Sequence, residues 1–272
     1  MILVALLLGS LGVADLVRRR MLSAHAIWLA TAAGVLIFLL GANGVGLAWW
    51  WSPIAVVAIS GWLTATREDT PALRSGYCAL GLLAAAIVAT VAFGPALAPV
   101  SGALVDWYSA LPYAGLVGVP FTAFALVLGG TLFLFESSNV IVRLALRGER
   151  SSIVDAAVPV TAQTAVVAAN AAPSRRWWRR SQSTPAAAPV SRFTELKGGR
   201  FIGPLERVFL LALVLTGQFT ALAAVIAAKG IVRFPEISKD ETGGSKAEYF
   251  LVGSFASWAL VVVVATLVKL VA

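Results

Sequence analysis

The basic residues best suited to hold a phosphate group lie at the start of an apolar stretch near the C-terminus. Lys197, Arg200 and Arg207 belong to the sequence KGGRFIGPLER. Free backbone N–H groups at a helix N-terminus, with cationic side chains beside them, can bind phosphate. The P-loop pattern is absent from this segment. We therefore expect phosphate or lipid-headgroup binding here, with simple anchoring of the helix as the alternative.

A second basic cluster combines cations with indole rings. Its members are Arg175, Arg176, Trp177, Trp178, Arg179 and Arg180. Such a segment partitions into anionic membrane interfaces, because the charges are attracted to the headgroups and the rings are buried beside them. The alternative is a solvated basic patch that only sets membrane topology. Nucleic acid is not an expected partner, since the basic residues flank apolar stretches.

The chain contains few of the residues that disulfide formation, metal binding and acid–base catalysis require. His25 is the only histidine and Cys78 the only cysteine, so the chain has no internal disulfide and no Cys/His metal framework. We expect no metal and no cofactor. Any acid–base step would depend on a carboxylate such as Glu206, although a carboxylate in a first helical turn is also explained by the helix dipole.

Polar residues near the C-terminus suggest a network on the outer side of a membrane. Lys229 and Arg233 share a helix face, and Glu236 and Glu248 could balance their charge. Glu248 also completes a capping box that begins at Ser245. A straight helix would separate Arg207 from Lys229 by about 33 Å, so we expect no common site for these two.

Small residues in the same region predict helix packing. Gln218 follows Gly217 and is followed at helical spacing by alanines; these are Ala221, Ala224 and Ala228. Small side chains let helices approach closely, and an amide can donate or accept across the contact. A role of Gln218 in a transport path is the alternative. For Asp15, pairing with the adjacent arginines is the simplest expectation.

These residues are positioned by long apolar stretches. Only 12% of residues are charged and the mean hydropathy is +0.88, which predicts an all-α, polytopic membrane protein. Seven stretches could span a bilayer, or six if the first is interfacial: 1–17, 24–40, 49–63, 77–97, 115–135, 205–228 and 248–271. We expect a five-helix region (1–136), a basic cytoplasmic segment with a disordered linker (137–203) and a two-helix hairpin (204–272).

The distribution of basic residues predicts the orientation. With an outside N-terminus and seven crossings, seventeen Lys and Arg residues face the cytoplasm and four face outside. The C-terminus is then cytoplasmic. The composition favours a bacterial plasma (inner) membrane.

The stretch 196–258 resembles a terminal membrane region of uncharacterised bacterial membrane proteins, a domain of unknown function. The resemblance is carried by GGRFIGPLER, TGQ, AAKGIVRFPEI and AEYFLVGS. Its matching polar positions are Arg207, Gln218, Lys229, Arg233, Glu236 and Glu248. The resemblance implies no activity.

Three functions are compatible with these patterns. We favour a non-enzymatic accessory or scaffold component whose basic linker binds anionic lipid, a membrane protein partner or a second copy of the chain. The first alternative is a membrane-embedded enzyme or flippase that handles a phosphate-bearing lipid through Lys197, Arg200 and Arg207. The second is a small-solute transporter.

Overall fold

The computed structural model of the protein describes all residues except 22–24, 68–72, 94–99, 158–198 and 239–244. Within the described part the chain is helical and contains no strand. The helices are α1 (Ile2–Arg20), α2 (Ala26–Gly44), α3 (Trp51–Ala65), α4 (Leu73–Phe93), α5 (Ala103–Ser109), the 3-10 turn η2 (Ala114–Leu116), α6 (Phe121–Phe135), α7 (Ser137–Ala157), α9 (Gly199–Leu215), α10 (Phe219–Ser238) and α11 (Ser245–Lys269).

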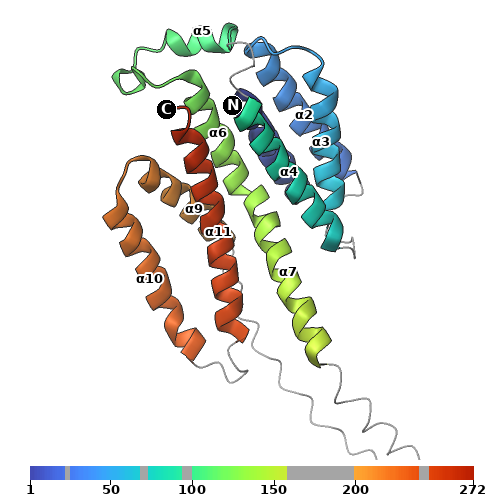
Figure 1. Ribbon diagram of the computed structural model, residues 1–272, viewed down its shortest axis with the longest axis vertical. Coiled ribbons are helices and arrows are strands. Elements are labelled where there is room, and N and C mark those ends of the chain that lie inside the picture. The colour runs from blue at the N-terminus through green and yellow to red at the C-terminus, as the bar shows by residue number, and fades with distance from the viewer. Residues whose placement is uncertain (22–24, 68–72, 94–99, 158–198, 239–244) are drawn as a thin grey trace, which may run out of the picture.

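Helix α1 lies in the middle of the bundle, between α2 and α6 (Figure 1). Glycines allow α1 and α6 to touch through their backbones. A Cβ atom added at Gly129 would lie 2.2 Å from the Ala5 carbonyl oxygen, and one at Gly12 would lie 2.4 Å from the Leu132 carbonyl. Small residues at such positions let helices pack closely in a bilayer, where burial of apolar surface does not drive association.

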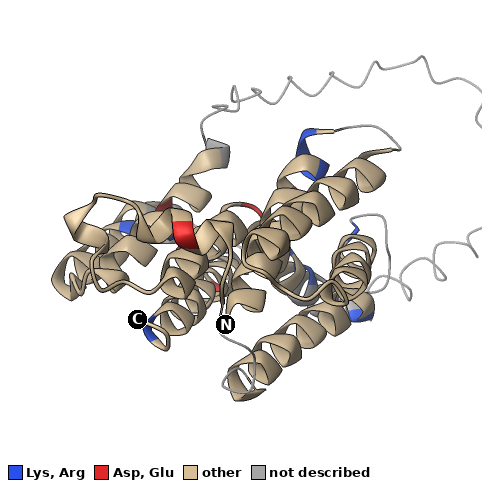
Figure 2. Ribbon diagram, turned by 90° about the horizontal axis from the view of Figure 1, so that it is seen from above, with Lys and Arg blue, Asp and Glu red and all other residues tan. Residues whose placement is uncertain are grey.

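Several helices are long and apolar enough to cross a membrane. They are α2, residues 74–93 of α4 and residues 247–269 of α11; α6 and α7, bent by 47° where they meet, count as a fourth if they form one span. Large apolar side chains such as Trp28 and Trp49 are exposed by 75% and 78%. Charged residues are sparse along the ribbon when it is seen from above (Figure 2). The prediction of a helical chain with several candidate membrane spans is confirmed within the described residues, whereas seven spans are not.

The expected single helix over 205–228 is wrong. Helix α9 ends at Leu215, Gly217 adopts a left-handed conformation with φ +72°, and α10 begins at Phe219. The Gln218 N–H donates to the Leu213 carbonyl at 2.9 Å, and the Gly217 N–H donates to the Val214 carbonyl at 3.3 Å. This is the hydrogen-bond pattern of a Schellman cap, which glycine adopts without a steric penalty.

Because of this turn, α9 and α10 form a helical hairpin, and the region 204–272 contains three helices where two were expected. Both chain termini lie at the same end of the bundle (Figure 1). An outside N-terminus with a cytoplasmic C-terminus would place them at opposite ends. The arginines that end α1 lie about 28 Å from its start, at the other end of the bundle.

Candidate functional site

A polar run interrupts the apolar helices where α6 meets α7. Glu136 lies at the break, with φ −128° and ψ −47°, and is followed by Ser137, Ser138 and Asn139. The Asn139 N–H donates to the Glu136 carbonyl at 2.9 Å, so α7 begins at once. The four side chains of this run contact charged residues from α1 and α9. The break therefore connects helices that are far apart in sequence.

Asp15 of α1 is buried against α3 and α7. Its Oδ2 atom accepts hydrogen bonds from Trp62 Nε1 at 2.9 Å and from Ser137 Oγ at 2.6 Å. Its Oδ1 atom lies 2.7 Å from an Arg18 guanidinium nitrogen. Arg18 also donates to the Leu63 carbonyl at 3.1 Å. The expected pairing of Asp15 with an adjacent arginine is confirmed, and the pair also fixes the end of α3.

Glu136 is only 2% exposed, and Arg19 of α1 forms an ion pair with it. The two residues come from the end of α1 and the α6–α7 break. Leaving a buried carboxylate without such a partner would cost several kcal/mol. The pair thus holds the break against α1.

Arg207 of α9 is buried at the centre of the C-terminal helices. Its Nε donates to Ser257 Oγ at 2.7 Å, and one terminal nitrogen donates to Ser138 Oγ at 2.7 Å and Asn139 Oδ1 at 2.6 Å. The same nitrogen lies 3.4 Å from the Leu134 carbonyl oxygen. Ser257 is equally far from the two ends of α11, about 18 Å along the helix. Arg207 therefore joins α7, α9 and α11 at mid-span.

The expectation that positions 207 and 229 are too distant for one site is wrong, because it assumed a straight helix. Lys229 of α10 lies 2.7 Å from Glu206 Oε1. Its ammonium group also lies 5.6 Å from the centre of the Trp258 ring and 5.9 Å from that of Phe250. Such contacts with an aromatic face are attractive. The α9–α10 turn brings all of these groups together.

We call these groups the charge network, in which Asp15, Glu136 and Arg207 are buried and the other members are partly exposed. It contains the carboxylates and cations Asp15, Glu136, Glu206, Arg18, Arg19, Arg207 and Lys229. Each carboxylate has a cation within reach, and the remaining cation, Arg207, is satisfied by neutral oxygen atoms. Intramembrane charges mark functional sites by default, but they are also satisfied when they fix helices together. The chemistry available here is charge pairing across five helices.

The structure separates most of the other predicted site residues from this network. Glu248 is exposed in the first turn of α11. It is not among the residues that contact Lys229 as described above. Gln218 and the three alanines of the predicted packing face are exposed within this chain. Packing of that face against a second molecule stays a prediction.

Several predicted positions fall outside what can be described. Lys197 and the cluster from Arg175 to Arg180 lie in 158–198, outside the described residues. Arg200, Arg233 and Glu236 lie on described helices, but their side chains do not belong to the described part. Phosphate binding by these groups stays a prediction.

Sequence reasoning missed the α6–α7 break. It ended a span at Phe135 and the five-helix region at Glu136, and it began the basic segment at residue 137. The signal was present, because ESSN is a polar run between two stretches that are both apolar enough to continue a helix.

Among the described residues, no group of three or more His, Cys, Asp or Glu is arranged to hold a metal ion.

Comparison with known proteins gives no relative. No protein-family model, curated protein sequence or solved structure matches the chain. The resemblance of 196–258 to a membrane region of unknown function therefore stays a prediction.

Proposed function

We propose that the chain is a non-enzymatic accessory or scaffold component of a bacterial plasma membrane, and that its basic cytoplasmic linker binds anionic lipid. The observation that carries the proposal is the satisfaction of Arg207 by Ser138, Asn139 and Ser257. A ligand-binding arginine would direct its donors to the ligand. Here the donors hold helices together, so we assign the interaction with lipid headgroups to the basic cluster from Arg175 to Arg180.

The proposed orientation follows from the same arrangement. Arg18, Arg19 and Arg20 end α1, Arg74 begins α4, and Lys269 lies at the opposite end of the bundle, near the C-terminus. Retention of basic residues in the cytoplasm places the arginine-rich end inside. Both termini then lie outside, and the α9–α10 hairpin enters and leaves from the cytoplasmic side. This arrangement avoids an excess of cations on the outer side.

Two of the residues assigned to the enzyme or flippase alternative are engaged in contacts within the protein. Arg207 is buried among hydrogen-bond acceptors of its own chain, and Glu206 is paired with Lys229. A general acid–base group must reach a substrate proton, and a headgroup ligand must reach the phosphate. A lipid-handling reaction would have to depend on Lys197 and Arg200, without Arg207 and Glu206.

The experiment is native mass spectrometry of the protein purified in mild detergent. It compares the wild type with a variant in which Arg175, Arg176, Arg179 and Arg180 are all changed to glutamine. A variant with lysine at the same four positions is the matched control, because it keeps the charge. We expect the wild type and the lysine variant to retain equal amounts of anionic lipid and the glutamine variant to retain less. Equal lipid retention by all three would reject the proposal.

A further inference from the structure

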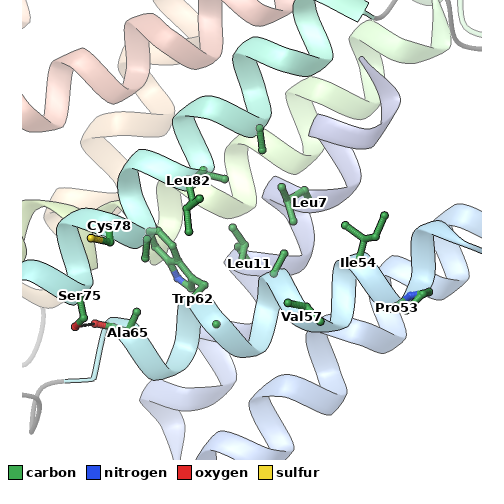
Figure 3. Close-up of a pocket in the computed structure, with 15 residues that line it drawn as sticks. Leu7, Leu11, Pro53, Ile54, Val57, Trp62, Ala65, Ser75, Cys78 and Leu82 are labelled. Atoms are coloured by element: carbon green, nitrogen blue, oxygen red, sulfur yellow. Dashed lines mark hydrogen bonds between the residues drawn. The ribbon is translucent and has the colours of Figure 1, made fainter.

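An apolar groove of about 760 Å³ lies between α3 and α4 (Figure 3). Its floor includes Leu7 and Leu11 of α1, and Trp62 of α3. Ile54 and Val57 contribute from α3 and Leu82 from α4, with exposures of 56%, 71% and 72%. Its volume lies in the range of about 300–1,000 Å³ that is usual for small-ligand sites. The lining is suited to hydrocarbon and offers little to a polar solute.

The groove is closed at one end and open at the other. Ser75 Oγ donates to the Ala65 carbonyl at 3.1 Å, which ties the end of α3 to the start of α4. From this closed end the two helices diverge (Figure 3). The lining on α3 runs from Pro53 to Ala65, about 18 Å along the helix axis. One leaflet of a bilayer contributes about 15 Å of hydrocarbon, so the groove matches an acyl chain in length.

Cations lie at the closed end of the groove. Arg67 follows Ala65 by two residues and Arg74 precedes Ser75, and both arginines are exposed. Glu68 and Asp69 also belong to this connection, although they lie outside the described residues. Arg18 contacts the same end of α3 through Thr66 Oγ1 at 3.0 Å and is paired with Asp15, and Arg67 also has a partner within the protein. A phosphate group at this end would meet guanidinium donors, which bind it strongly.

We propose that the groove holds one acyl chain of a glycerophospholipid from the cytoplasmic leaflet, with the lipid phosphate at Arg74. This inference rests on the orientation given under Proposed function, because the closed end must lie at the cytoplasmic headgroups. It does not involve the cluster from Arg175 to Arg180. The bound lipid covers the exposed apolar walls and keeps α3 and α4 apart at the open end.

Two glycines provide matched variants that test the groove. A Cβ atom added at Gly61 or at Gly81 would meet nothing within 4 Å, so either position accepts a larger side chain. Gly61 lines the groove, whereas Gly81 is not among the lining residues. Gly61→Phe therefore fills the lipid site, and Gly81→Phe adds the same bulk elsewhere. Both replace glycine within a helix, which removes the conformational cost of glycine there.

The first measurement counts phospholipid retained by the full chain in native mass spectrometry at limiting phosphatidylglycerol. We expect the wild type and Gly81→Phe to retain one more lipid than Gly61→Phe. Arg74→Gln should weaken retention about tenfold through loss of a charge-assisted hydrogen bond. Diacylglycerol with the same acyl chains, which lacks the phosphate, should be retained less well than phosphatidylglycerol.

The chain's only cysteine gives a second readout, because Cys78 lines the groove and is exposed. Phosphatidylglycerol should slow alkylation of Cys78 by a maleimide, whereas glycerophosphate without acyl chains should not. Equal lipid retention by Gly61→Phe and Gly81→Phe would overturn the proposal. So would a wild-type dimer, lost in Gly61→Phe, that retains no lipid, because a second copy would then cover the groove.

These results are independent of the linker. If the glutamine variant of Arg175, Arg176, Arg179 and Arg180 retains less anionic lipid than the wild type but keeps the protection of Cys78 by phosphatidylglycerol, both proposals hold. Linker-dependent lipid binding without any protection of Cys78 would remove the groove proposal alone.

Discussion

Glu206 and Lys229 lie 2.7 Å apart although 23 residues separate them in the sequence. The contact is possible only because the chain reverses at Gly217 between α9 and α10. It brings a charge from α10 to the middle of the C-terminal helices. The same reversal places the C-terminus at the end of the bundle that holds the N-terminus.

Changing Lys229 to methionine should destabilise the protein by about 1–3 kcal/mol, because Glu206 would be left partly buried without its cation. The measurement is thermal unfolding in detergent for both single variants and for the double variant with Glu206→Gln. The double variant should recover much of the loss, since neither charge then remains unpaired. Strictly additive losses would show that the pair is not coupled.

Arg207→Met should lower stability by about 1–3 kcal/mol, because it leaves Ser138, Asn139 and Ser257 without their shared donor. Arg207→Lys should restore only part of the loss, because an ammonium group cannot reproduce the planar fork of donors. Thermal unfolding and the yield of folded protein report the effect. A stable Arg207→Met protein that has lost phosphate-lipid binding would instead favour a direct role in ligand binding.

Gly129→Ala should destabilise the bundle by at least about 1 kcal/mol, because its Cβ would overlap the Ala5 carbonyl and force α1 and α6 apart. Gly230→Ala is the control, since a Cβ there meets nothing within 4 Å. That substitution should be neutral or stabilise α10 by up to about 1 kcal/mol through helix propensity. Equal unfolding temperatures for the two variants would count against backbone contact between α1 and α6.

Much of the helical framework could be predicted from hydropathy. The stretches at 24–40, 49–63 and 248–271 correspond to α2, α3 and α11, whose bounds differ from them by a few residues. Each has an uninterrupted apolar sequence between polar ends, so the local pattern determines the element. The pairing of Asp15 could also be predicted, because its partner Arg18 is one helical turn away.

The turn at Gly217 could not be predicted in this way. A glycine within an apolar stretch fits both a packing contact and a left-handed cap, and local sequence does not distinguish them. The partners of Arg207 could not be predicted from the sequence for a different reason. Ser138 and Ser257 lie 69 and 50 residues from it, so only the packing of α7, α9 and α11 brings them together.

The most direct measurement of the central arrangement is the location of the C-terminus in intact cells. Alkaline phosphatase, which is active only outside the cytoplasm, and a green fluorescent protein, which is bright inside, are each fused after Ala272. A fusion of the same two reporters after Ser238, the last residue of α10, probes the end of the α9–α10 hairpin that leads to α11. The account predicts active phosphatase at the C-terminus and bright fluorescence at position 238. A fluorescent C-terminal fusion with inactive phosphatase would contradict it and favour the seven-span arrangement.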